Sequence, residues 1–176
     1  MKIPKQILNL LIMGMSCIVF FGCAGLRESR KIENDFTLVF PWTDDYTTLT
    51  TPDGQVYYEA WEWGFADDVD EFLGYVFPKT VIYEKDTVNI LVGIVTTGRI
   101  LKVVVLSANH NIPRDFLLQF EGKGVQDSFE IVRNTENILI VPSKIKPISG
   151  NIEISQMIAD SVKEALLSAN LTTARY

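Results

Sequence analysis

The chain has almost no cysteine and almost no histidine, and these two absences exclude several kinds of chemistry. Its 176 residues include two cysteines, Cys17 and Cys23, and one histidine, His110. Both cysteines lie close to the N-terminus, so thiol catalysis, disulfides and cysteine-ligated zinc or iron–sulfur sites are excluded from the rest of the chain. A lone histidine supports neither a metal site nor a histidine-based triad, and we expect His110 to lie exposed in a loop rather than to carry protons. No catalytic or metal-ligating residue is predicted.

Positively charged residues are also fewer than negatively charged ones. The chain has 16 Lys and Arg residues against 22 Asp and Glu residues, which gives a net charge of −6. An acidic protein repels the phosphates of DNA and RNA. We therefore predict no nucleic-acid partner.

The first residues have the pattern of a bacterial lipoprotein signal. Lys2 and Lys5 precede an almost unbroken apolar run, Ile7–Phe21, and Gly22 stands directly before Cys23. The apolar run is short for a transmembrane helix and ends in small residues, as secretory signals do. We predict a signal peptide over residues 1–22. The alternative, an uncleaved N-terminal anchor, leaves the domain on the same side of the membrane.

On this interpretation Cys23 becomes the first mature residue and carries the lipid. Residues 23–35 form a polar tether, and loss of the signal changes the net charge to −8. The protein is then held at a membrane on the extracytoplasmic side. Ala24 after the cysteine favours the outer membrane or cell surface over the inner membrane.

Residues 36–170 are expected to form one globular domain, followed by a tail over residues 171–176. Apolar residues recur at helical spacing along the last segment, as Ile158, Val162, Ala165 and Ala169 show. The remaining elements are predicted as strands at 36–40 (or a docking segment there), 55–63, 71–77, 86–95, 99–106, 128–132 and 138–141, with a short helix at 113–120. Strands 86–95 and 99–106 form the best-defined hairpin. This order predicts an α+β domain, mainly an antiparallel sheet with a short helix and a long C-terminal helix.

The start of the C-terminal helix is the first candidate for a ligand site. Pro147, Ser149, Gly150 and Asn151 precede the helix and are residues that end a strand and turn the chain. A helix start presents unpaired N–H groups and a partial positive charge, which together can hold a phosphate.

From Phe36 to Ala169 the sequence resembles the FMN-binding domain family. That family includes the extracytoplasmic flavoprotein subunits of Rnf and sodium-translocating NADH:quinone reductase complexes. The resemblance lies in segments that occur in the same order: Leu38–Pro41, Val56–Ala60, Glu71–Phe77, Ile90–Leu106, Phe116–Lys123 and Ile148–Gly150 with the final helix. It implies an FMN-binding-domain-like fold, an extracytoplasmic location and one-electron transfer by FMN.

The sequence departs from the family at the residues that hold the flavin. Members of the family attach FMN to a threonine, and Ile152 stands at that position, preceded by Asn151 in place of alanine. Isoleucine has no hydroxyl, so attachment there is chemically impossible. The nearby hydroxyls are Ser149 and Ser155. The resemblance thus implies FMN held noncovalently, with Ser149, Gly150, Asn151 and Ser155 as candidate binding residues, or FMN lost.

A second family motif is also altered. Its histidine, glutamate, threonine and glycine correspond to Asn109, Asn111, Ile112 and Arg114. An acidic run at 67–71 could hold calcium or be a solvated loop. Trp61 and Trp63 could stack on a flavin ring or a partner, or pack in the core or on the sheet. Salt bridges to a phosphate could come from Arg114, Lys144 and Lys146, which could equally be solvated.

Two functions follow as hypotheses. In the first, the protein is lipid-anchored and takes part in membrane-associated electron transfer, with FMN noncovalent or lost and a redox protein as partner. In the second, a non-catalytic envelope lipoprotein binds a partner protein or small ligand. The loss of the flavin-accepting threonine favours the second hypothesis, and the retained turn before the helix favours the first.

Overall fold

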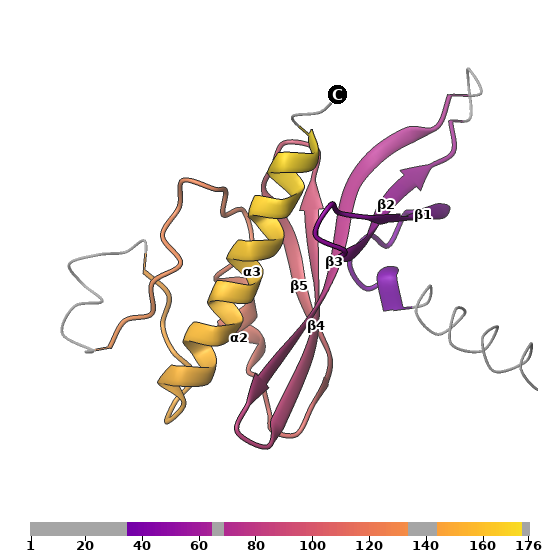
Figure 1. Cartoon of the computed structure of the whole chain (residues 1–176). Coiled ribbons are helices and arrows are strands. Elements are labelled where there is room, and N and C mark those ends of the chain that lie inside the picture. The colour runs from indigo at the N-terminus through magenta and orange to yellow at the C-terminus, as the bar shows by residue number, and fades with distance from the viewer. Residues whose placement is uncertain (1–34, 65–68, 134–143, 174–176) are drawn as a thin grey trace, which may run out of the picture. The chain divides into compact units, whose positions relative to one another are not determined.

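The structure is a computed structural model that describes residues 35–64, 69–133 and 144–173. Within these residues five strands form one antiparallel sheet in chain order, β1 (Asp45–Thr50), β2 (Val56–Glu62), β3 (Glu71–Tyr83), β4 (Asp86–Val95) and β5 (Ile100–Ala108). Two helices follow, α2 (Arg114–Leu118) and α3 (Ile152–Thr173). Figure 1 shows α3 running along one face of the sheet.

The centre of the sheet is the ladder between β3 and β4, which pairs Gly74–Tyr83 with Asp86–Val95. Val, Ile and Leu dominate β4 because this strand is covered on both faces. The predicted hairpin between β4 and β5 is confirmed. Gly98 adopts φ +70° in its turn and donates its N–H to the carbonyl of Val95 at 2.9 Å, a backbone conformation that glycine adopts readily.

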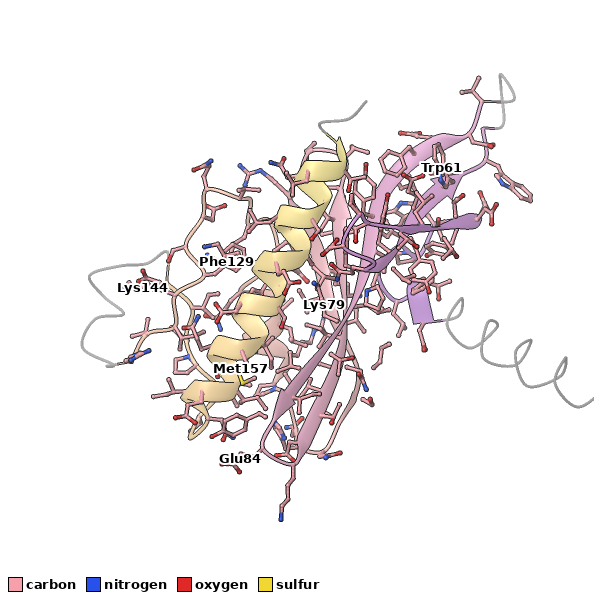
Figure 2. The ribbon with its side chains drawn as sticks, viewed as in Figure 1. Trp61, Lys79, Glu84, Phe129, Lys144 and Met157 are labelled. Carbon is pink, nitrogen blue, oxygen red and sulfur yellow. The ribbon has the colours of Figure 1, made fainter. Side chains whose placement is uncertain are left out.

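One face of the sheet packs against α3. The buried residues of α3 recur at helical spacing and pack against alternate residues of the two central strands. On α3 they are Ile154, Ile158, Val162, Ala165, Leu166 and Ala169. On β3 and β4 they are Phe77, Ile90, Val92 and Ile94. At the edge of this contact the ammonium of Lys79 lies 2.8 Å from the carboxylate of Glu164. Figure 2 shows Lys79 beside α3.

The opposite face of the sheet is covered by the segment Phe36–Phe40. This segment is a helical turn, in which the N–H groups of Val39 and Phe40 donate to the carbonyl of Phe36 at 2.8 and 3.0 Å. Phe36, Val39 and Phe40 pack on a second apolar cluster with Ala60, Val76 and Leu91. Gly93 lets the turn approach, because a Cβ built there would lie 2.0 Å from a methyl of Val39.

Several predicted strands need correction. Residues 36–40 are helical rather than extended, and β1 forms in a Thr-rich stretch for which no strand is predicted. Residues 128–132 make no strand; Phe129 and Ile131 are buried from a loop, and Ile131 forms only an isolated bridge with Ile145. Burial in a loop gives the same apolar pattern as a strand, which explains the error. The strand predicted at 138–141 lies outside the described residues.

The predicted fold class is therefore wrong as stated. An FMN-binding-domain-like α+β domain would return to strands after the short helix and before the long one. The described residues instead form a five-stranded antiparallel meander, completed before α2 begins, and this arrangement fits an α+β layout only loosely. The physical reason is that each described strand pairs with the strand that follows it in the chain, as antiparallel neighbours readily do.

The predicted signal peptide, Cys23 and all but the last residue of the tether lie outside the described residues. Among the helices that the structure describes, none is both long enough and apolar enough to cross a membrane.

The close approach at Gly93 gives a first prediction. We expect Gly93→Ala to lower the free energy of unfolding by about 1–3 kcal/mol, because the new methyl overlaps Val39 and must displace the Phe36–Phe40 turn. Urea denaturation followed by circular dichroism measures this loss. Gly124→Ala is the matched control, since the nearest atom to a Cβ there is 3.8 Å away. The double variant with Val39→Ala should recover part of the loss, and additive effects of the two substitutions would contradict the proposed overlap.

Candidate functional site

The turn before α3 is held by its own backbone. Gly150 has φ +78°, and the N–H of Asn151 donates to the carbonyl of Ile148 at 3.0 Å. The first hydrogen bond of the helix follows, from the N–H of Ser155 to the carbonyl of Asn151 at 3.1 Å. Glycine is suited to the left-handed residue of such a turn, so the sequence Ser-Gly-Asn reverses the chain directly into the helix.

Ser155, one of the predicted flavin-binding residues, has a structural role here. Its side chain is fully buried; its hydroxyl accepts the N–H of Ile148 at 2.9 Å and donates to the carbonyl of Asn151 at 2.6 Å. These bonds tie the turn to the helix and occupy the hydroxyl. The Ser155 side chain is therefore not presented to a ligand.

An open pocket of about 670 Å³ lies beside this turn. Its lining comes from the end of β3, the loop segments around 132–133 and 146–151, and the first turn of α3, with Tyr83, Arg133, Lys146, Ser149, Asn151 and Glu153 as its polar residues. The volume is within the range of small-molecule sites. The predicted residues Ser149, Gly150 and Asn151 are thus brought together at one pocket, and Arg133 joins them without having been predicted.

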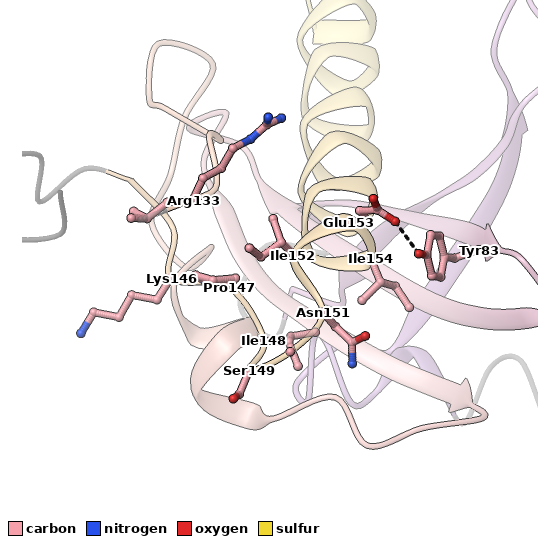
Figure 3. Close-up of a pocket in the computed structure, with 12 residues that line it drawn as sticks. Tyr83, Arg133, Lys146, Pro147, Ile148, Ser149, Asn151, Ile152, Glu153 and Ile154 are labelled. Carbon is pink, nitrogen blue, oxygen red and sulfur yellow. Dashed lines mark hydrogen bonds between the residues drawn. The ribbon is translucent and has the colours of Figure 1, made fainter. Parts of the chain in front are cut away.

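The polar side chains of this pocket do not converge on one point. Figure 3 shows Lys146, Ser149, Asn151 and Arg133 pointing in different directions around the turn. Specific small-molecule sites place a few polar groups so that they meet on the ligand. The arrangement at this turn lacks that property.

A carboxylate already stands at the start of α3. Glu153 accepts a hydrogen bond from the hydroxyl of Tyr83, and this bond raises the pKa of the Tyr83 phenol to about 12. A negative side chain in the first turn compensates the positive end of the helix. Glu153 thus provides, within the chain, the charge that a phosphate would otherwise bring, and repels a second anion.

The fit of FMN to these residues can be tested group by group. Covalent attachment fails at Ile152, which carries no hydroxyl, and at Ser155, whose hydroxyl is buried and bonded. For a phosphate bound noncovalently, Lys146 and Arg133 supply positive charge at the pocket, but the negative carboxylate of Glu153 repels the phosphate. The residues at the start of α3 do not form a complete FMN site.

The other predicted phosphate ligands are dispersed. Lys144 pairs with Glu130 at 2.6 Å, a contact that lowers the pKa of that carboxyl, and Arg114 opens α2 and does not line the pocket. His110 is partly buried rather than exposed, with its Nδ1 3.5 Å from the carboxylate of Asp86. Asn109 donates to the same carboxylate at 3.3 Å.

The predicted acidic run at 67–71 is only partly described. Asp67 and Asp68 lie outside the described residues, while Asp70 and Glu71 are exposed. In the described part of the chain no three acidic, histidine or cysteine side chains gather as metal ligands would.

The two tryptophans predicted to stack do not share one environment. Trp61 lies in β2, with its ring 5.0 Å from that of Phe72, and its buried indole Nε1 has no hydrogen-bond partner among the described residues. Trp63 follows the strand and is 59% exposed.

Glu59, between Tyr57 and Trp61 on one face of β2, is a residue that the sequence analysis missed. Its side chain is only 8% exposed, burial raises the pKa of its carboxyl, and no described residue gives it a hydrogen bond or ion pair. The aromatic rings around it are in contact, with Tyr57 5.9 Å from Tyr75. The feature of the sequence that could have identified Glu59 is a single acidic residue between aromatic residues of a strand. Side chains alternate between the two faces of a strand, so positions 57, 59 and 61 share one face.

No family model matches this chain, and a search of the curated proteins finds no match.

The two hydrogen bonds of Ser155 give a second prediction. Ser155→Ala leaves the buried N–H of Ile148 without its acceptor, so we expect the free energy of unfolding to fall by about 1–3 kcal/mol. Ser168→Ala in the same helix is the control, because the hydroxyl of Ser168 bonds to the Glu164 carbonyl near the surface. Equal urea midpoints for the two variants would show that the hydroxyl of Ser155 does not hold the turn.

The buried carboxyl of Glu59 gives a third prediction, on pH. Burial raises its pKa above the ordinary value of 4.5, so the folded state is disfavoured once the carboxyl ionises. This destabilisation is absent below pH 4.5 and grows as the pH rises through the folded pKa. Glu59→Gln should therefore raise the urea midpoint near pH 7 and leave it unchanged below pH 4.5. Glu121→Gln, an exposed acid, should show no such pH-dependent difference, and a lower midpoint for Glu59→Gln near pH 7 would refute the burial argument.

Proposed function

We propose that this protein is a lipid-anchored, extracytoplasmic binding protein without a catalytic role. The observation that carries the proposal is the state of the start of α3, where the resemblance would place a redox cofactor. Ile152 lacks a hydroxyl, Ser155 is used to hold the turn, and Glu153 supplies the negative charge. A domain that retains such a turn without the groups that hold a cofactor is suited to binding rather than electron transfer.

The anchor is supported by the sequence of the first residues. A positive start, a short apolar run and Gly22-Cys23 are the features that lipoprotein signals share. A lipid on Cys23 would hold the domain at a membrane through a short polar tether.

Binding needs a surface rather than a set of reacting groups, and the domain offers one. Trp42 and Trp63 are each more than half exposed, and exposed aromatic residues are enriched where proteins meet partners. The backbone segments that carry them are joined, because the carboxylate of Asp44, two residues after Trp42, accepts the backbone N–H of Trp63 at 3.0 Å. This end of the sheet is the part of the domain that supports the proposal most directly.

Noncovalent FMN is the second candidate. The pocket beside α3 favours it, since its volume suits a small molecule and Arg133 and Lys146 line it. If FMN binds there, its phosphate would lie at the helix start and its flavin ring would supply the redox chemistry.

Colour separates the two candidates and gives a fourth prediction. We expect the full chain, purified in detergent after expression with or without a flavin transferase, to be colourless and to retain no added FMN. An absorbance scan before and after acid precipitation makes the measurement. A flavin band that leaves with acid would support the second candidate, and a band that stays with the pellet would contradict the argument on Ile152 and Ser155.

A matched pair of variants makes a positive result interpretable. If FMN does bind beside α3, Lys146→Ala should weaken it, whereas Lys85→Ala in the exposed turn between β3 and β4 should not. Equal effects would place the flavin elsewhere on the protein.

A further inference from the structure

The two edges of the sheet differ in how they are covered. At β5 the chain folds back on its own edge, where the N–H of Ile100 donates to the carbonyl of Lys123 and the N–H of Gly122 donates to the carbonyl of Ile100. At β1 no described residue pairs with the outer side of the strand. Four of the six residues of β1 are exposed.

The open edge has few of the devices that usually prevent strands from pairing. Proteins protect sheet edges with lysine, proline or bulges. β1 has none of these, since its sequence is Asp-Tyr-Thr-Thr-Leu-Thr and its register with β2 runs without a shift. Threonine also favours the extended conformation. The backbone of β1 is thus ready to accept another strand.

The stretch of sequence that forms this edge carries charge of one sign. Between Asp35 and Pro78 the sequence contains ten acidic residues and no lysine, arginine or histidine, together with all three tryptophans. Glu62 and Glu71 are direct partners across β2 and β3, an arrangement of like charges that destabilises a sheet unless a cation relieves it. The partner that complements this end of the domain is therefore positively charged.

One acid of this region is buried and unpaired close to the open edge. Glu59 faces Thr47 of β1 across the ladder. Its carboxylate makes no hydrogen bond or ion pair with a described residue, although its side chain is only 8% exposed. Trp61, two residues along β2 on the same face, has a buried indole N–H that is also unpaired within the described chain. Figure 2 shows Trp61 at the end of the sheet away from Glu84.

We propose that β1 receives an extended segment of a basic polypeptide as a sixth strand, and that a Lys or Arg of this segment reaches across Thr47 to the carboxylate of Glu59. The inference rests on the proposed binding function and specifies its partner. Strands are about 4.8 Å apart, so the added strand would lie two spacings from Glu59. Threonine is small enough to let a long side chain pass over it. Backbone hydrogen bonds then supply affinity, and the cation beside aromatic rings supplies selectivity.

Binding of a labelled peptide to the full chain in detergent micelles tests the proposal. The probe is a short peptide of alternating Lys and Thr, and its counterpart has Glu in place of Lys. We expect the Lys peptide alone to bind, with an affinity that falls as salt rises. Amide hydrogen exchange should show new protection in β1. Equal binding of the Glu peptide, or binding without protection of β1, would overturn the proposal.

Variants test the role assigned to Glu59. Glu59→Gln should weaken binding of the Lys peptide by about tenfold or more, because it removes the partner of a buried charge. Glu121→Gln should leave the affinity within about twofold of the unsubstituted protein. Thr47→Lys, at an exposed position where folding is not at risk, should abolish binding by placing a cation over Glu59. Unchanged affinity in both Glu59→Gln and Thr47→Lys would overturn the proposal.

Two other occupants are outcomes of the same experiment. If spermine displaces the Lys peptide at equal charge concentration, the site takes small cations and not a strand. If the protein alone forms dimers with protected β1 amides, a second copy occupies the edge. Either result overturns the proposal. The flavin measurement uses a different end of the domain and a different signal, so failure of the peptide to bind is distinguishable from failure of the proposed function.

Discussion

The packing of α3 on β3 and β4 is the contact on which the rest of the structure depends. Ile158, Val162 and Ala165 are fully buried and meet the alternate apolar residues of the central strands. Burying an isoleucine or valine side chain contributes roughly 1.5–3 kcal/mol before conformational entropy is subtracted, so this layer is a large source of stability. The position of α3 also fixes its first turn, where the candidate cofactor residues lie.

The first turn of α3 shows how a helix start can be satisfied from within the protein. A helix start is a common anion site because its N–H groups and its dipole favour negative charge. Here Ser155 joins the turn to the helix, and Glu153, hydrogen-bonded to Tyr83, supplies a carboxylate in the first turn. The same residues that make the turn stable thus remove much of its capacity for an external phosphate.

The two faces and the β5 edge of the sheet are covered by different parts of the chain. One face carries α3, the other the Phe36–Phe40 turn, and the β5 edge is covered by the chain that follows α2. No described residue pairs with the β1 edge, which lies in a part of the sequence, residues 35–78, that has no positively charged residue. A buried carboxylate beside it, at Glu59, is a cost to the folded state that a cationic partner would relieve.

Local patterns in the sequence determined the β4–β5 hairpin, the helix at α2 and the apolar stripe of α3, because turn residues and periodicity depend on neighbours in the chain. They also determined that Ile152 cannot accept a flavin, which is a matter of chemistry and not of shape. Only the tertiary structure decided that residues 36–40 are helical, that residues 128–132 are a buried loop and that the described residues form no strand after β5. It likewise decided that Ser155 is buried and that Glu59 has no hydrogen-bond or ion-pair partner among the described residues. Burial, pairing and the choice between a strand and a packed loop are set by contacts between distant residues, which an apolar pattern alone does not specify.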